Sequence, residues 1–236
     1  IHCHVLPGVD DGARSADSTK RMLKIAAEEG IDAIVATPHF KYGMDAAQMQ
    51  QIKKMYTVVR NWWKRKEPNR ELYLGSELYY SENLVDALKQ GTALTMNDTS
   101  YVLVEFPVYA EVSQVERAVR NLRYAGYIPI IAHVERYQHL RDAGRVKNLI
   151  EIGAYIQTNV SVIMGKHSWS SKRRTMKFLK QGLIHFIATD AHNSKERRPE
   201  MKKCAAYLGK KLGREKTHQL LVENPEKMLR GEELNG

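Results

Sequence analysis

Two histidines stand two residues apart near the start of the chain, in the apolar run "IHCHVLPGVDDGA". If this run is a β-strand, its period of two points His2 and His4 to the same face of a sheet. Two imidazoles on one face form a metal-binding geometry, and two carboxylates, Asp10 and Asp11, follow directly. The alternative is that each histidine is a hydrogen-bonded core residue, so the remainder of the chain must decide.

Similar side chains recur at the ends of other apolar runs. Short runs rich in Val, Ile and Leu alternate with helical patterns, which predicts parallel strands joined by crossover helices. We expect seven strands, over residues 1–5, 31–39, 71–79, 101–106, 127–134, 154–160 and 184–192. Helical patterns with apolar spacing and a terminal glycine cover residues 15–30, 112–126 and 170–182. No linker interrupts the series, so residues 1–236 are expected to form one β/α-barrel domain.

The predicted strands deliver imidazoles and carboxylates to one rim. In a β/α barrel the carboxyl ends of the strands converge at one mouth, where active sites are built. Because buried charges are costly unless paired or metal-bound, this rim predicts a metal site. The candidate ligands are His2, His4, Asp11, His39, Glu77, Glu105, His133, Asp190 and His192. Asn159 ends another strand and could line the pocket as a hydrogen-bonding residue.

Four other histidines do not fit this pattern and are assigned no role. Three of them lie in helical or connecting segments: His139, His167 and His218. His185 begins the last predicted strand, so it should lie at the opposite end of the barrel.

The candidate ligands indicate phosphoester hydrolysis. A mixed set of imidazoles and carboxylates suits Mn, Zn or Fe rather than Mg or Ca, and its size suits two or three ions. Such ions, about 4 Å apart, activate water and hold the attacking and leaving oxygens of phosphoryl transfer. Arg136 and Arg197 follow His133 and His192 at the same rim, and guanidinium groups match phosphate oxygens.

The alternative for the two arginines is local ion pairing. Arg136 is adjacent to Glu135, and Arg197 is adjacent to Glu196. Arg198, the next residue along the chain, competes with Arg197 for the same role.

Composition excludes several classes of protein. No apolar run reaches the roughly 18 residues that cross a membrane, and no signal peptide is evident, so we expect a cytoplasmic protein without membrane insertion. Cys3 and Cys204 form no disulfide framework, and neither is followed six residues later by arginine, which excludes a cysteine-dependent phosphatase. The net charge of +10 attracts anionic partners without choosing among them.

A set of ordered motifs resembles a known superfamily. The motifs "HCH", "GVDDG", "TPHF", "GSE", "LVEF", "AHVERY" and "TDAH" occur in this order between His2 and about Arg197. They resemble the PHP (polymerase and histidinol phosphatase) superfamily. Within it, they resemble the manganese-dependent bacterial protein-tyrosine phosphatases encoded with capsule and exopolysaccharide genes.

The resemblance implies a distorted, TIM-like (β/α)7 barrel that holds three ions, Mn²⁺ with Fe or Zn possible in some sites. It assigns the first ion to His2, His4, Glu77 and Asp190; the second to Glu77, Glu105 and His133; and the third to Asp11, His39 and His192. Spacing alone does not separate Asp10 from Asp11; the family pattern favours Asp11.

The resemblance also implies a reaction and a partner. A metal-bound hydroxide would attack phosphotyrosine directly while Arg136 and Arg197 grip the phosphate. The substrate would be the tail of a bacterial tyrosine kinase that regulates capsule or exopolysaccharide synthesis. Charge and resemblance together suggest that Lys172, Arg173 and Arg174 guide this acidic tail. No nucleic-acid partner is expected.

Three other functions stay open. Histidinol-phosphate phosphatase would use the same metals, although a basic surface does little for a cationic substrate. A nuclease or other phosphoesterase would use the basic helices with Trp62, Trp63 and Trp169, but "RNWWKRK" is more typical of a helix end that packs on the barrel. A non-catalytic module would bind a phosphoprotein without cleaving it.

Overall fold

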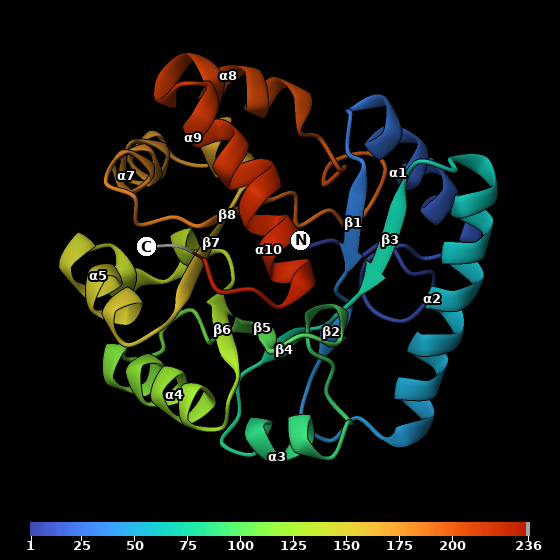
Figure 1. Ribbon diagram of the computed structural model, residues 1–236, viewed down its shortest axis with the longest axis horizontal. Helices are drawn as coiled ribbons and strands as arrows, with labels where there is room; N and C mark the ends of the chain where they lie inside the picture. The colour runs from blue at the N-terminus through green and yellow to red at the C-terminus, as the bar shows by residue number, and fades with distance from the viewer. Residues whose placement is uncertain (235–236) are drawn as a thin grey trace.

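The strands form a curled parallel sheet. The structure is a computed structural model that describes residues 1–234 (Figure 1). Within these residues, one sheet pairs β1 with β3, and the other has the order β2-β4-β5-β6-β7-β8, with every pairing parallel. The strands are β1 (Ala33–Ala36), β2 (His39–Phe40), β3 (Glu71–Leu74), β4 (Glu77–Tyr79), β5 (Tyr101–Glu105), β6 (Ile128–Ile131), β7 (Tyr155–Asn159) and β8 (Phe186–Ala188).

The N-terminal segment closes the two sheets into a ring. Cys3 forms a parallel bridge with Ala191, and the amide of His4 donates to the Ala191 carbonyl at 2.8 Å. On its other side, the amide of Thr37 donates to the Cys3 carbonyl at 2.9 Å. The strand predicted over residues 1–5 is therefore reduced to a single bridge, but it fills the gap between β8 and β1. The predicted distorted (β/α)7 barrel is confirmed.

Two of the predicted strands are broken. The strand expected over 31–39 divides into β1 and β2 around Pro38, which has no amide proton to offer a neighbour. The strand expected over 71–79 divides into β3 and β4 at Gly75, where an added Cβ would lie 2.8 Å from the Met96 Sδ. Both breaks come just before a candidate ligand, so β2 and β4 begin at His39 and Glu77.

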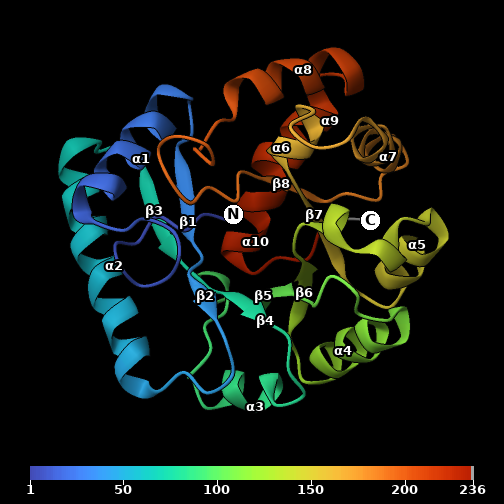
Figure 2. The ribbon, with the colours of Figure 1, turned by 180° about the vertical axis from the view of Figure 1, so that it is seen from behind.

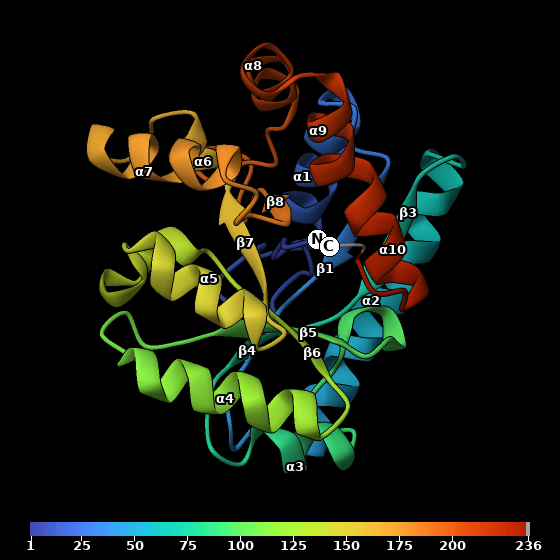
Figure 3. The same cartoon turned by 60° about the vertical axis from the view of Figure 1, so that its left-hand side comes forward.

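Helices surround the ring, as the views from behind and from the side show (Figures 2 and 3). The expected helices over 15–30, 112–126 and 170–182 are confirmed as α1 (Ala16–Glu28), α4 (Val112–Tyr124) and α7 (Trp169–Lys180). The others are α2 (Ala46–Lys66), α3 (Leu84–Lys89), α5 (Ala143–Glu151), α6 (Val160–Ile163), α8 (Lys202–Leu212), α9 (Arg214–His218) and α10 (Asn224–Arg230). None of these helices combines the length and apolar character needed to cross a membrane.

Two apolar clusters hold the fold together. The larger one packs the helices against the outside of the ring and includes Trp63, which is buried at the end of α2 as predicted. The smaller one joins strand side chains such as Leu103, Ile130 and Phe186 to Met228 of α10. In Figure 1, α10 crosses in front of the barrel. Apolar packing thus closes this end, and the polar residues lie at the carboxyl ends of the strands.

Candidate metal centre

Glu77 is the centre of the polar cluster. This side chain is only 1% exposed, and its Oε1 lies 2.7 Å from the Nε2 of His133. Three further imidazole nitrogens surround Oε2: His2 Nε2 at 3.1 Å, His4 Nε2 at 3.2 Å and His39 Nδ1 at 3.1 Å. Even so, Oε2 is buried without a hydrogen bond of acceptable geometry. A carboxylate oxygen placed in this way fits a bridging metal ligand, because it faces several nitrogen donors without bonding to any.

The structure brings all nine predicted ligands together. Their donor atoms form three overlapping groups, each within 4.8 Å: His4, Asp11, His39 and His192; His2, His4 and Glu77; and His39, Glu77 and Glu105. His133 joins the last group, with its Nε2 3.3 Å from Glu105 Oε1. Asp190 joins the second, with its Oδ1 3.5 Å from His2 Nε2 and 3.6 Å from His4 Nε2. Metal binding by these residues stays a prediction, and the donor set fits it.

The two neighbouring aspartates occupy different places. Asp10 accepts hydrogen bonds from His4 Nδ1 at 2.7 Å and from the amides of Gly12 and His39. Asp11 faces the cluster instead, with Oδ1 3.3 Å from His39 Nε2 and 3.5 Å from His192 Nε2. Asp10 therefore orients the imidazole of His4 from behind, as carboxylates commonly do for ligating histidines. Gly12 permits this turn, because a Cβ there would lie 2.2 Å from the His4 carbonyl oxygen.

Gln157 was missed by the sequence analysis. Its Oε1 accepts hydrogen bonds from His2 Nδ1 at 3.2 Å and from the His133 amide at 2.8 Å. Its Nε2 donates to Asn159 Oδ1 at 2.8 Å, and Asn159 Nδ2 donates to Asp190 Oδ2 at 2.9 Å. The prediction that Asn159 is a hydrogen-bonding residue of the pocket is confirmed. The period of two in "AYIQTNV" was the available signal for Gln157, since it places both amides on one face.

Neighbouring carboxylates raise the pKa of two buried imidazoles, although burial alone would lower it. Burial disfavours the charged form of His4, but its hydrogen bond to Asp10 and the negative charge of Glu77 raise its pKa to about 10. Burial opposes charge on His133 too, yet Glu105 and Glu77 raise its pKa to about 9. The site therefore favours positive charge beside Glu77, whether a proton or a metal ion carries it.

Both predicted arginines converge on one carboxylate. The Nη2 atoms of Arg136 and Arg197 contact Asp190 Oδ2, the latter at 2.8 Å. Burial would raise the pKa of Asp190, but the charges of His2, Arg136 and Arg197 hold it well below its usual range. Arg136 is 37% exposed and Arg197 43%, so their guanidinium groups remain open to the mouth.

Local ion pairing does not account for these arginines. Glu135 instead accepts hydrogen bonds from Thr158 Oγ1 at 2.8 Å and from the Asn159 amide at 3.2 Å. Arg198 pairs with Glu200, so of the two adjacent arginines it is Arg197 that reaches Asp190. The geometry thus favours Arg136 and Arg197 as the pair that faces the candidate metal centre.

Two residues of the cluster adopt a left-handed backbone. His133 has a φ of 32° and Asp190 a φ of 49°, a region that side chains with a Cβ rarely occupy. Each stands two residues beyond the end of a strand, where this turn aims its side chain at Glu77 or at the arginines. Backbone strain of this kind collects at functional sites, where the surrounding structure enforces it.

The remaining histidines lie outside the cluster. His139 is near Glu111, His167 bonds to Ser161 and His218 bonds to Glu223. His185 packs against Tyr155 at the other end of β7, as its sequence position predicted.

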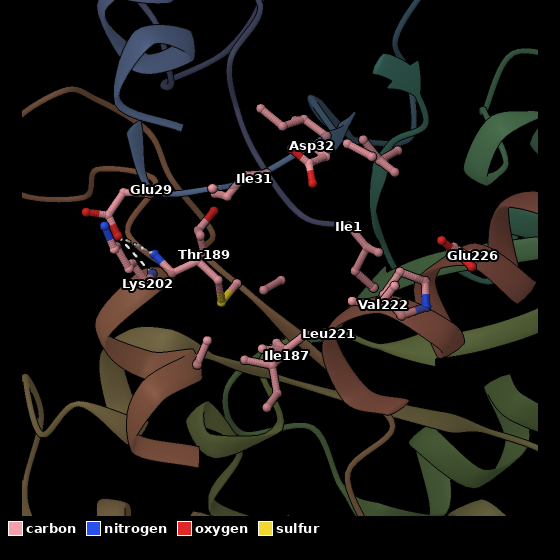
Figure 4. Close-up of a pocket in the computed structure, with 18 of the residues that line it drawn as sticks. Ile1, Glu29, Ile31, Asp32, Ile187, Thr189, Lys202, Leu221, Val222 and Glu226 are labelled. Atoms are coloured by element: carbon pink, nitrogen blue, oxygen red, sulfur yellow. Dashed lines mark hydrogen bonds between the residues drawn. The ribbon is translucent and has the colours of Figure 1, made fainter. Parts of the chain in front are cut away.

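The two thiols and a second cavity also lie outside the cluster. Burial raises the pKa of both Cys3 and Cys204 to about 12, so neither is a reactive thiolate. A largely apolar cavity of about 380 Å³ lies between β1, β8 and the C-terminal helices (Figure 4). Ile31, Ile187 and Leu221 line it, and no histidine does, so it is separate from the candidate metal centre.

Comparison with known proteins identifies close relatives over the whole chain. Residues 1–230 match the family model described as "Capsular polysaccharide synthesis, CpsB/CapC". The tyrosine-protein phosphatase CpsB of Streptococcus pneumoniae is 32% identical over 235 residues, which covers 97% of each protein. The tyrosine-protein phosphatase YwqE of Bacillus subtilis is 31% identical over 233 residues, 98% of this chain and 91% of that protein.

A solved structure matches as well. It comes from work on YwqE of Bacillus subtilis and CpsB of Streptococcus pneumoniae, described as "unique metal-dependent tyrosine phosphatases". The TM-score is 0.91 at 30% sequence identity, and the match covers 100% of this chain and 95% of that one.

Proposed function

The chain belongs to the CpsB/CapC family of capsular polysaccharide synthesis proteins, and on that premise we propose that it is a metal-dependent protein-tyrosine phosphatase. Relatives that match nearly their full length carry this activity in their names, and a solved relative is described as metal-dependent. The observation that carries the proposal is the buried, unbonded Glu77 Oε2 among three imidazole nitrogens. This arrangement supplies the mixed carboxylate and imidazole donors that suit divalent transition metals.

We propose that three divalent ions occupy the mouth, and that Mn²⁺ is the effective metal. His2, His4, Glu77 and Asp190 would hold the first ion; Glu77, Glu105 and His133 the second; and Asp11, His39 and His192 the third. Bound divalent ions acidify water to a nucleophile and neutralise charge on the phosphoryl oxygens. Asp10 and Gln157 would orient the imidazoles of His4 and His2.

Arg136 and Arg197 are proposed to bind the phosphoryl group. Their guanidinium groups meet at Asp190 Oδ2 and stay partly open to solvent, so an incoming dianion can replace part of their contact with that carboxylate. Charge on the equatorial oxygens of the transition state would then be stabilised by donors that are already in position. The leaving phenolate has a pKa near 10, which makes a dedicated general acid dispensable.

The proposed substrate is the phosphorylated tail of a bacterial tyrosine kinase. The basic helix α7 lies beyond β7 and offers Lys172, Arg173 and Arg174 to an acidic peptide. Arg173 stacks over the exposed Trp169 ring at 5.4 Å, which holds its charge at the surface.

The free, buried state of Cys3 and Cys204 supports a reducing compartment such as the cytoplasm.

The function is tested by restoring metal to chelated protein. After EDTA treatment and re-addition of Mn²⁺, we expect phosphate release from a phosphotyrosine peptide and much less from the matched phosphoserine peptide. Strong turnover of histidinol phosphate without tyrosine activity would keep the metal centre and overturn the substrate. Peptide binding without phosphate release would indicate a non-catalytic module, and release of nucleotides from nucleic acid would indicate a nuclease.

A further inference from the structure

A small basic pocket adjoins the proposed phosphate site. It has a volume of about 190 Å³ and lies between the loop after β7 and the loop after β8. Arg136, Arg197 and Asp190 form its inner part, whereas no histidine of the candidate metal centre lines it. Asp190 separates the two spaces, because its Oδ1 faces His2 and His4 while its Oδ2 faces the arginines.

The outer part of this pocket carries cations that the proposed reaction does not use. Lys166 and Arg198 are these cations, and His167 lines the pocket beside them, with its Nε2 3.0 Å from the Ser161 hydroxyl. Lys166 Nζ bonds to Glu200 Oε2 at 2.8 Å, and Arg198 bonds to Glu200 Oε1. One carboxylate thus serves two cations. Glu196 also lines the pocket, so its lining carries four cationic side chains, Arg136, Lys166, Arg197 and Arg198, against the three carboxylates Asp190, Glu196 and Glu200, and the net charge stays positive.

The contacts of Glu200 are open to exchange. The Lys166 side chain is 49% exposed and that of Glu200 is 24% exposed. A half-exposed ion pair is weak because solvent screens it, so an anion from another molecule can compete for Lys166 and Arg198. The pocket is smaller than a site for a whole small-molecule ligand, and its size suits one acidic group.

We propose that this pocket is an anion subsite that receives a carboxylate or a second phosphoryl group flanking the phosphotyrosine of the substrate. The inference rests on the proposed phosphatase function and names the peptides that it prefers. Acidic groups near the scissile phosphotyrosine reach Lys166 and Arg198 while the phosphotyrosine itself engages Arg136 and Arg197. The enzyme then selects substrates by two features: the phosphotyrosine and the acidic group that flanks it.

The test compares two variants whose effects should have opposite signs. Lys166→Ala removes a cation from the pocket, and Glu200→Gln removes the carboxylate that competes with the substrate. Lys180→Ala is the matched control, because Lys180 is an exposed lysine at the far end of α7 and does not line the pocket. The substrates are p-nitrophenyl phosphate and three phosphotyrosine peptides: one with neutral flanks, one with flanking glutamates and one with a second phosphotyrosine.

We expect Lys166→Ala to raise KM for the glutamate and doubly phosphorylated peptides about threefold, the size of a partly screened ion pair. Glu200→Gln should lower KM for the same peptides by a similar factor. For both variants, kcat should be unchanged, as should KM for the neutral peptide and for p-nitrophenyl phosphate. Added salt should shrink both changes.

The possible results distinguish a failure of the proposed anion subsite from a failure of the proposed phosphatase function. Unchanged KM values for both variants on the acidic peptides, with normal turnover of the neutral peptide, would overturn the subsite alone. Absence of turnover of every phosphotyrosine substrate by the Mn²⁺-loaded protein would overturn the function and the subsite together. An effect limited to the glutamate peptide, or to the doubly phosphorylated one, would identify which acidic group the pocket receives.

Discussion

His4 at the mouth of the barrel and His185 at its other end respond to burial in opposite ways. At the mouth, His4 is buried among carboxylates and its pKa rises to about 10. At the other end, burial and the charge of Lys216 lower the pKa of His185 to about 4. His185 stays neutral there, and its Nδ1 accepts a hydrogen bond from the Ile156 amide at 3.1 Å. Burial acts alike on both rings, so Asp10 and Glu77 beside His4 account for the difference. His192 is also at the mouth, but burial and the charge of His4 lower its pKa to about 4.

One end of the barrel stabilises the fold, and the other end carries the chemistry. Apolar side chains such as Phe186 and Met228 fill the end near His185 and supply packing energy. The mouth instead collects charged groups whose burial is costly without partners. Changes at the mouth should therefore alter metal binding and catalysis, and changes at the opposite end should alter stability.

The largest effect is expected at the centre of the mouth. Glu77→Gln removes the carboxylate that faces four imidazoles, so phosphotyrosine hydrolysis should fall by more than about a thousandfold. Bound manganese, measured by elemental analysis after dialysis, should fall too. A variant that keeps full metal content and activity would show that Glu77 is no part of the centre.

A smaller effect is expected where the mouth meets the phosphate. Arg136→Ala should lower kcat/KM by about 10²–10³, the cost of one preorganised donor, with metal content unchanged. Arg120→Ala, an exposed arginine on α4, serves as the control and should leave both quantities unchanged. Equal activity of the two variants would remove Arg136 from the phosphate site.

A substitution at the opposite end should lower the stability of the protein and leave its catalytic rate unchanged. Met228→Ala leaves a cavity in the barrel interior, because Met228 is completely buried there, and should lower the free energy of unfolding by about 2–5 kcal/mol. Urea unfolding measures this loss, while kcat at low temperature should match the parent. Val58→Ala, at an exposed site on α2, should change stability by less than about 0.5 kcal/mol. A kcat loss in Met228→Ala would show that the two ends are coupled.

The smallest effect is a pH dependence from His185. Its pKa is about 4 in the folded protein and near 6.5 in the unfolded chain, so the unfolded chain binds more protons between these values. Stability from this group is therefore complete above pH 6.5 and is lost as the pH falls toward 4. Between pH 7 and pH 5 the loss should be about 2 kcal/mol.

His185→Asn isolates this contribution from that of the mouth. The asparagine side chain offers an oxygen acceptor close to the position of Nδ1, without a proton that titrates in this range. The fall in unfolding free energy between pH 7 and pH 5 should be smaller in the variant by that amount. Identical pH profiles would mean that folding does not lower the pKa of His185.

The sequence located most of the mouth because chemistry-bearing residues stood at the ends of apolar runs. That regularity held for Glu105 and Asn159, which end β5 and β7, and for His133, which lies just past β6, whereas His39 and Glu77 begin β2 and β4 after breaks in the predicted strands. It failed for Gln157, an uncharged residue inside a strand that carries no metal-binding signature of its own. It also left Asp10 and Asp11 unseparated, since the choice depends on how a turn folds over His4.

The sequence by itself determined the residue types, their order and the end of the barrel at which each would lie, because strand periodicity and helix spacing are local properties. Only the tertiary structure decided that three imidazoles meet one oxygen of Glu77 and that Arg197 rather than Arg198 reaches Asp190. These contacts depend on closure of the ring, where the segment around Cys3 lies between Ala191 and Thr37. Local periodicity determines the face of a strand on which a side chain lies. Only closure of the ring determines which side chains from different strands come into contact.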